Sequence, residues 1–346
     1  MSKITIFSFL VVFISFLSGC GQVKTINLKR HQFSTAPTQV VWLQVAGLKP
    51  EHFSMIRFGE NTSEKVMAME KATCVANLWN YNLYDLRPTA AESFYGQVYG
   101  SKNVSGQCRD YKRSPFWMGL APQEYHVAIL ESTNNFSWSD RKEACLDDQE
   151  VANEIKSHYR RVGHFKMQKS PTQSPLTFHY QEKKELQTGQ KYYDRSCQSG
   201  ECFARLSDNA RFLWENFSTD YQRKILIVQD DSYLNALREQ DYSKAQEILY
   251  EIEKTYAYFA RIQSNRSDFL LILSSAEAVG LEMPKSIDDW TRFFSGGKNL
   301  VSKTTTLDSM LFAQGARAEN FCGVYQEAEV AHRLRWEYQS RGILNR

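Results

Sequence analysis

The chain has 346 residues, of which 42% are hydrophobic and 23% are charged, with 42 basic and 39 acidic side chains. This is the composition of a globular protein with one large or two medium domains, and it excludes a disordered chain and a collagen-like repeat. A mean hydropathy of -0.49 and a single strongly apolar stretch exclude a multi-span membrane protein. The net charge of +3 attracts nucleic acid only weakly, and the aromatic residues are not interleaved with basic runs. We therefore expect no nucleic-acid partner.

The N-terminus has the order of features found in an export signal. A short start with Lys3 is followed by an apolar run, Ile4 to Leu17, that is too short for a comfortable membrane span, and then by small residues and Cys20. This order resembles the lipobox of bacterial lipoproteins, where the signal is cut before a cysteine that is then acylated. The resemblance implies a signal peptide over residues 1–19 and a lipid such as palmitate on Cys20. An uncleaved anchor or an ordinary signal peptide is the alternative.

Residues 20–38 are polar and show no apolar periodicity, so we expect a tether that holds the folded domain off the lipid surface. Gly21 follows the cysteine where some lipoproteins have Asp. By resemblance to enterobacterial lipoproteins, this favours the outer membrane. The prediction is a protein of the bacterial cell envelope, bound to the membrane through Cys20, with an envelope protein as a further partner.

Six cysteines remain once Cys20 is set aside, and an even number in an exported chain favours three disulfides. Cys197 and Cys202 close a short loop, so we pair them. Of the remaining pairings we favour Cys74–Cys108 and Cys145–Cys322. A zinc site built on these thiols is the competing interpretation, but the sequence has no CxxC pair and no histidine at ligand spacing. We expect no metal there.

Short apolar runs between polar or turn residues predict buried strands. The runs are Val40–Val45, Val127–Leu130, Ile225–Val228, Phe269–Leu273 and Met310–Ala313. Apolar residues over 245–260 recur at helical spacing. Strands that alternate with helices predict an α/β domain over 39–346, with a mainly parallel sheet covered on both faces. The stretch 165–201 contains two prolines, many polar residues and no signature of a buried strand, so we expect an insertion or cap and not a separately folded domain.

The residues that follow the strands carry a resemblance to a known family. Four segments have the order and character of its successive strand and helix motifs: Val40–Pro50, Arg87–Gly100, Lys224–Asn235 and Phe269–Ala278. They resemble the alkaline phosphatase superfamily, in the branch that contains nucleotide pyrophosphatases, phosphodiesterases and sulfatases. The resemblance implies an alkaline phosphatase-like α/β fold with a polar insertion. It also implies a site where metal ions and a Ser or Thr nucleophile transfer phosphate or sulfate.

Most of the family's functional positions hold residues that cannot do this chemistry here. Ala46 occupies the position of the family's first metal-binding Asp, and Ala90 that of its nucleophile. Asn235 replaces a His, and Ala276 with Glu277 replaces an Asp-His pair. Asp231 matches the one ligand that remains in register, and the family's last histidine is missing from 312–323. The resemblance thus implies a protein that has the family's fold but lacks the residues that bind its metal ions and the nucleophile.

Two groups of residues admit a second interpretation. Thr89 lies one residue from the nucleophile position, but we favour its role as the N-cap of a helix that starts at Ala90, with Glu92 completing a capping box. Arg317, Glu319 and Asn320 follow a strand and either bind an anionic ligand or form an internal Arg-Glu pair, which we favour.

The sequence therefore predicts a non-catalytic binding or scaffolding protein, a pseudoenzyme that lacks a cofactor. The alternative is a zinc-dependent hydrolase or transferase of phosphate or sulfate esters that uses Thr89, Asp231 and Glu277.

Overall fold

The computed structural model describes residues 36–59, 66–120, 125–132, 137–171, 176–178, 186–198, 201–217, 223–294 and 301–335. The predicted signal peptide, Cys20 and most of the tether lie outside these residues. No helix in the described part of the chain is both long enough and apolar enough to cross a membrane.

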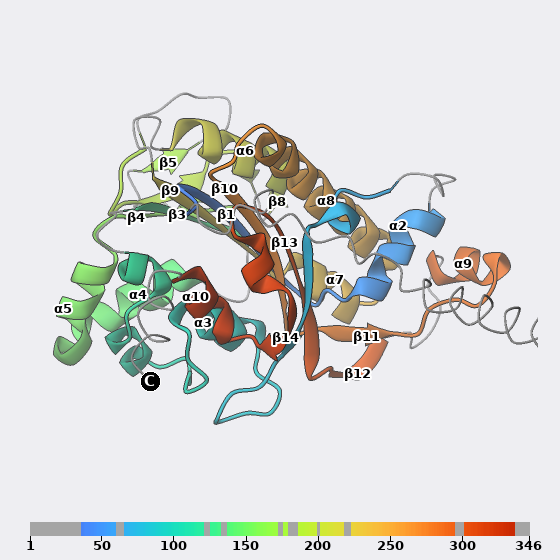
Figure 1. The fold of residues 1–346 in the computed structure, drawn as a ribbon, viewed down its shortest axis with the longest axis horizontal. Helices are drawn as coiled ribbons and strands as arrows, with labels where there is room; N and C mark the ends of the chain where they lie inside the picture. Colours follow the sequence, from blue (N-terminus) through green and yellow to red (C-terminus); the bar gives the residue numbers. More distant parts are fainter. Residues whose placement is uncertain are drawn as a thin grey trace, which may run out of the picture. The chain divides into compact units, whose positions relative to one another are not determined.

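A ten-stranded sheet forms the centre of the described part, with strand order β14-β2-β13-β10-β1-β9-β3-β4-β6-β5 (Figure 1). Strand β13 runs antiparallel to both of its neighbours, β10 and β2, and the other neighbouring pairs are parallel. The strands of this sheet are β1 (Gln39–Ala46), β2 (Cys74–Trp79), β3 (His126–Ser132), β4 (Val162–Lys166), β5 (Thr177–Phe178), β6 (Lys191–Asp194), β9 (Lys224–Asp230), β10 (Phe269–Ala276), β13 (Asp308–Gly315) and β14 (Gly323–Gln326). The mainly parallel sheet predicted from the sequence is confirmed.

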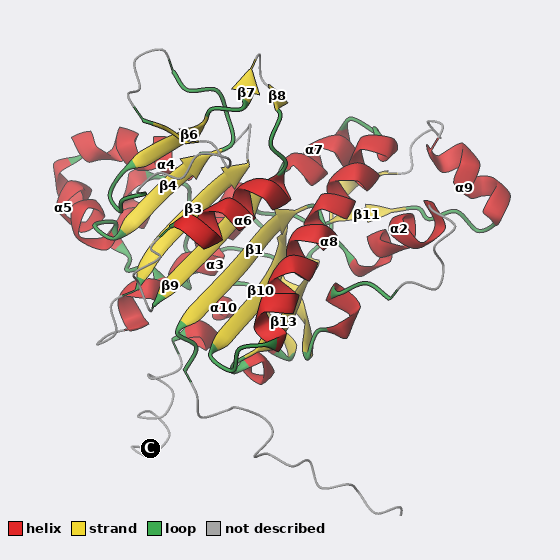
Figure 2. Ribbon diagram, turned by 90° about the horizontal axis from the view of Figure 1, so that it is seen from above, coloured by secondary structure: helices red, strands yellow, loops and turns green. Residues whose placement is uncertain are grey.

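Helices cover both faces of this sheet, as predicted. Figure 1 shows α6 and α8 on one face and α3, α4 and α10 on the other, and Figure 2 shows α6 and α8 lying across the strands. The α-helices are α2 (Phe53–Gly59), α3 (Ala90–Tyr99), α4 (Trp138–Ala144), α5 (Gln149–His158), α6 (Leu206–Asn216), α7 (Ser232–Arg238), α8 (Tyr242–Ser264), α9 (Ile287–Phe294) and α10 (Glu329–Leu334). Two small two-stranded sheets are separate from the main sheet: β7–β8 (Cys197–Gln198 and Glu201–Cys202) and β11–β12 (Val279–Leu281 and Val301–Thr305).

The core lies on the central strands. Strands β1 and β10 are neighbours, and every residue of both is buried because helices cover each face. Unbroken apolar runs are expected for strands of this kind. The five predicted strands lie in β1, β3, β9, β10 and β13, and the predicted helix lies within α8.

The stretch 165–201 differs from its prediction. The sequence has no signature of a buried strand there, but the end of β4 and the short strands β5 and β6 extend the sheet at its edge. Strand β4 includes His164 and Lys166, both of which are buried. These polar residues give no buried-strand signal in the sequence, because their partners are distant in the chain. Glu131 Oε1 lies 3.3 Å from His164 Nδ1, and Lys166 forms an ion pair with Asp140.

The structure joins the cysteines as Cys74–Cys322, Cys108–Cys145 and Cys197–Cys202. The three disulfides and the Cys197–Cys202 pair are confirmed, whereas the predicted pairs Cys74–Cys108 and Cys145–Cys322 are wrong. Cys74 begins β2 and Cys322 directly precedes β14, and because these two strands are parallel neighbours the two Cα atoms lie 5.0 Å apart. Cys108 and Cys145 begin two 3₁₀ helices, Cys108–Lys112 and Cys145–Asp147, with Cα atoms 5.3 Å apart.

Candidate functional site

The candidate site lies at the carboxyl ends of the three central strands. β9, β1 and β10 are adjacent and parallel, with Val45 paired to Asp230 and Ala46 paired to Ala276. Helix α7 follows β9 and packs against Gly47. A Cβ atom added to Gly47 would lie only 3.0 Å from the Cα of Leu234. Gly47 has a φ of +88°, so only glycine fits this turn without strain. The edge where ligands bind in open α/β sheets is thus closely packed here.

Helix α3 begins at this edge as the sequence predicts. Thr89 is its N-cap, and the Glu92 N–H donates to the Thr89 hydroxyl at 3.4 Å while the Thr89 N–H donates to Glu92 Oε2 at 2.8 Å. This is the capping box expected from the sequence. The Thr89 hydroxyl also donates to Glu92 Oε2 at 3.0 Å, so both of its contacts stay within the first turn of its own helix.

The side chain of Glu277 contacts the N-terminus of α3. The Ala90 N–H donates to Glu277 Oε2 at 2.7 Å, and Arg238 at the end of α7 forms an ion pair with the other carboxylate oxygen. Glu277 is only 8% exposed and has a φ of 44°, a left-handed conformation that is rare for a residue other than glycine. Burial raises the pKa of this carboxyl, while Arg238 and the Ala90 N–H oppose the shift. The chain thus places its own carboxylate where the helix would bind an anion.

Asp230 ends β9 and Asp231 follows it, and both are buried. The Asp230 carboxylate accepts a hydrogen bond from the Ser232 N–H at 2.7 Å, and burial raises the pKa of Asp230 to about 6, with Asp231 adding to the shift. Asp231 is the N-cap residue of α7. The Asn235 N–H donates to the main-chain oxygen of Asp231 at 3.0 Å. Asp231 therefore precedes α7 at this edge, and Asn235 lies in the first turn of this helix.

Comparison with solved structures identifies this architecture. Alkaline phosphatase from the Antarctic bacterium TAB5 superposes with a TM-score of 0.61 at 12% sequence identity, covering 87% of this chain and 97% of that chain. The cold-active enzyme from Shewanella sp. gives a TM-score of 0.61 at 10% identity over 86% and 99% of the two chains. The Thermus thermophilus alkaline phosphatase gives a TM-score of 0.59 at 10% identity, covering 91% of this chain and 94% of that chain. The chain has the alkaline phosphatase fold. Its sequence matches no family model and no curated protein.

The donor set at the carboxyl edge does not fit the metal ions that the alkaline phosphatase fold implies. A zinc site gathers about four N, O or S donors at about 2 Å from the ion. Among the described residues, one group has three such atoms within 4.8 Å of one another, formed by Asp194, Cys197 and Cys202, and its two cysteines are joined in a disulfide. Asp231 and Glu277 belong to no such group, and the Glu277 carboxylate is already bound by Arg238.

The predicted cluster of Arg317, Glu319 and Asn320 lies away from this edge. β13 is antiparallel to β10, so its end at Gly315 pairs with Leu270 at the amino end of β10. The cluster follows that end and forms the 3₁₀ helix Ala318–Phe321, whose Asn320 main-chain oxygen accepts from Arg333. A structural role in closing the domain fits this position. His332, the first histidine after 312–323, also lies away from this edge, since its Nε2 is 2.9 Å from the Gly100 oxygen at the C-terminal end of α3.

Sequence reasoning missed a buried polar network beneath the edge. Gln97 of α3 accepts hydrogen bonds from Gln44 at 3.1 Å and from Ser274 at 2.7 Å, and donates to the buried carboxyl of Glu327 at 3.5 Å. Ser93 also donates to Glu327, at 3.2 Å. One signal was present in the sequence, because Gln44 and Ser274 interrupt otherwise apolar strands and buried polar groups need partners. The network links β1, β10 and α3 through buried hydrogen bonds.

Glu327 makes the stability of the protein depend on pH. Burial raises the pKa of Glu327 from 4.5 to about 8. Between these values the folded protein holds a proton that the unfolded chain releases, so the free energy of unfolding falls as pH rises. We expect a fall of about 1 kcal/mol between pH 7 and 8, and Glu327→Gln should flatten this slope. Urea denaturation across this range measures it, and an equal slope in both proteins would show that Glu327 is ionised in the fold.

Proposed function

We propose that this protein is a non-catalytic binding or scaffolding member of the bacterial cell envelope, in which the alkaline phosphatase fold is kept and its reaction site is filled. One observation carries the proposal. The carboxylate of Glu277 takes the Ala90 N–H at the start of α3 and is held there by Arg238. An incoming phosphate or sulfate would need the same N–H group and would meet a negative charge.

The residues around Glu277 support the proposal. Ala46, Ala90 and Ala276 offer only methyl groups at the positions that the resemblance assigns to a ligand, the nucleophile and a second ligand. Metal ions in such a site polarise the transferring group and activate the attacking oxygen, and each effect lowers the barrier by several kcal/mol. Thr89 provides no substitute, because its hydroxyl is bound to Glu92. In this proposal the protein binds an envelope partner and turns over no ester.

The test is metal content together with hydrolysis. Purified protein, incubated with zinc and magnesium and then dialysed, should retain well under one zinc per chain. It should hydrolyse p-nitrophenyl phosphate, bis-p-nitrophenyl phosphate and p-nitrophenyl sulfate no faster than the buffer does. Thr89→Ala serves as the matched variant and should behave identically. Stoichiometric zinc with ester hydrolysis that Thr89→Ala abolishes would establish the alternative, a hydrolase or transferase with a rearranged site.

The envelope location rests on Cys20, which we propose carries the lipid that anchors the protein, in the outer membrane. The support is the order of charged, apolar and small residues that precedes it. Cys20→Ser should leave an unprocessed precursor without incorporated palmitate, which radiolabelling and gel mobility detect. Normal processing of the Ser variant would rule out a lipobox.

A further inference from the structure

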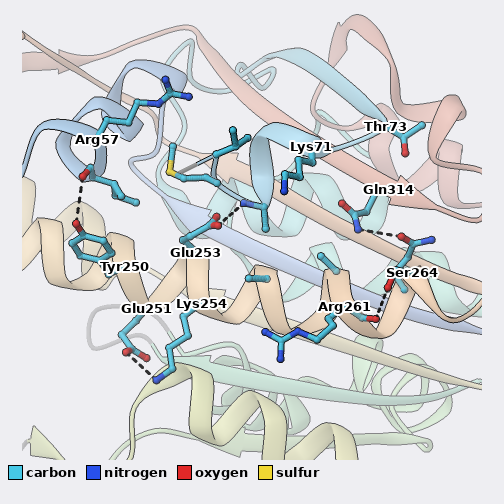
Figure 3. Close-up of a pocket in the computed structure, with 17 residues that line it drawn as sticks. Arg57, Lys71, Thr73, Tyr250, Glu251, Glu253, Lys254, Arg261, Ser264 and Gln314 are labelled. Atoms are coloured by element: carbon cyan, nitrogen blue, oxygen red, sulfur yellow. Dashed lines mark hydrogen bonds and ion pairs between the residues drawn. The ribbon is translucent and has the colours of Figure 1, made fainter. Parts of the chain in front are cut away.

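A groove runs between α8, α2 and the 3₁₀ helix η2 (Met69–Lys71), and it has a volume of about 770 Å³ (Figure 3). Small-molecule sites commonly measure about 300–1,000 Å³. The lining includes residues of α8 from Tyr250 to Ser264, which at about 1.5 Å per residue is roughly 21 Å of helix. None of the residues discussed at the carboxyl edge lines it. The groove therefore suits an elongated ligand at a place separate from the candidate site.

One part of the groove is lined by apolar side chains. Ile56 and Met67 are 7% and 4% exposed, and they lie against the same space as the partly buried Tyr250, Ala257 and Ala260. Tyr250 is fixed by a hydrogen bond from its hydroxyl to the Ile56 main-chain oxygen at 3.3 Å. The side chains of Ala257 and Ala260 are small, so they leave room for a hydrocarbon chain to lie along α8 and bury apolar surface.

The other end of the groove is polar and positively charged. Figure 3 shows Lys71, Arg261 and Gln314 at this end, away from Arg57 and Tyr250. Within the described parts of the chain, neither Lys71 nor Arg261 forms an ion pair. Gln314 donates to Gln263 at 3.1 Å, which fixes an amide beside the two cations.

The remaining charges in the groove are already bound. Arg57 pairs with Glu70, and Lys254 pairs with Glu251 at 3.5 Å. Glu253 accepts hydrogen bonds from the main-chain N–H groups of Ala68 and Met69, at 2.5 and 3.5 Å, and so holds the start of η2. With Glu70, the lining carries four basic and three acidic side chains, so the groove keeps a small positive excess. Its cations without an ion pair among the described residues are Lys71 and Arg261.

We propose that this groove binds an anionic amphiphile, with its hydrocarbon chain along the apolar part of α8 and its acidic head group between Lys71 and Arg261. A carboxylate and a phosphate share this chemistry, so a free fatty acid and a lysophospholipid are both candidate sources. A neutral lipid would leave the two cations without partners, and a cationic one would be repelled. This inference goes beyond the proposed function, because it concerns a second site and does not depend on whether the first is catalytic.

Calorimetric titration with dodecanoate and with dodecyl phosphate, each below its micelle concentration, tests the proposal. Both anions should bind with about 1:1 stoichiometry, while dodecanol and dodecyltrimethylammonium should bind at least about tenfold more weakly. The tighter of the two anions identifies the source as a carboxylate or a phosphate lipid. Equal binding of the neutral and anionic compounds, or no binding of either anion, would overturn the proposal.

Charge and shape variants locate the site. Lys71→Glu and Arg261→Glu should each weaken dodecanoate binding about tenfold. Lys156→Glu, a matched change at an exposed position of α5, should leave dodecanoate binding unchanged. Ala260→Trp should block the place of the hydrocarbon chain, and the melting temperature of this variant checks that it folds. If Ala260→Trp does not fold, Ala257→Trp, one turn earlier in α8, is used in its place. If Lys71→Glu and Lys156→Glu have the same effect, the anion binds elsewhere. Ester hydrolysis with intact dodecanoate binding would refute the proposed function alone.

Discussion

Replacing Cys74 and Cys322 together by alanine should lower the free energy of unfolding by about 5 kcal/mol. This disulfide joins residues separated by 248 positions, nearly the full length of the described chain. In the chain-entropy model a cross-link restricts the unfolded state more when it closes a longer loop. The bond also ties β2 to β14 at the edge of the sheet, where β14 has a neighbour on one side only. Urea denaturation of the oxidised proteins measures the loss.

The matched control is the double variant Cys197→Ala with Cys202→Ala. These cysteines are separated by 5 positions, so the same model gives a loss of only about 2 kcal/mol. The two losses should therefore differ by about 3 kcal/mol. If the short loop costs as much as the long one, the Cys74–Cys322 bond is not formed in the folded protein or the unfolded chain is already compact.

The central fold could be predicted from the sequence because its strands are buried on both faces. β1, β3, β9 and β10 appear as apolar runs for that reason, and their order with the helices indicates a parallel sheet. β2 could not be found in this way, since its residues alternate between buried and exposed and its run carries Asn77. Strands of four residues or fewer, such as β14 and β6, also carry too few residues for a periodic signal.

Strand direction was the main information that the sequence lacked. An apolar run has no direction, so the sequence does not show that β13 is antiparallel and that the residues after it lie at the opposite edge from those after β10. The wrong disulfide pairs have the same origin, because the pairing of Cys74 with Cys322 follows from β2 and β14 being parallel neighbours. These relations depend on long-range contacts between segments that are far apart in the sequence.

At the candidate site, the sequence indicated which residues are absent but not what takes their place. Ala90 and Glu277 were recognised as departures from the family, and Thr89 as a helix cap. The contact between Glu277 and Ala90 could not be foreseen, because it needs a left-handed backbone at Glu277 and an arginine supplied by α7. The role of Glu327 cannot be predicted from the sequence either, since its hydrogen bonds come from Ser93 and Gln97 of α3.

Removing the Glu277 side chain should turn this filled edge into an anion site. In Glu277→Ala the Ala90 N–H at the start of α3 loses its acceptor and Arg238 loses its ion-pair partner, so the variant should be less stable by about 1–3 kcal/mol in buffer without phosphate or sulfate. Both groups then favour an external oxyanion, because the helix start and a guanidinium attract negative charge. Sulfate or phosphate should restore the lost stability.

The measurement is the free energy of unfolding against phosphate concentration, at constant ionic strength set with sodium chloride. With a Kd near 1 mM, 100 mM phosphate would stabilise Glu277→Ala by about 2.7 kcal/mol, and the wild type should not respond. Glu277→Gln keeps an acceptor for the Ala90 N–H and should respond weakly, while Glu277→Ala with Arg238→Ala should lose most of the gain. If phosphate stabilises the wild type as much as Glu277→Ala, the Glu277 carboxylate does not occupy the anion position, and the main support for a non-catalytic protein is lost.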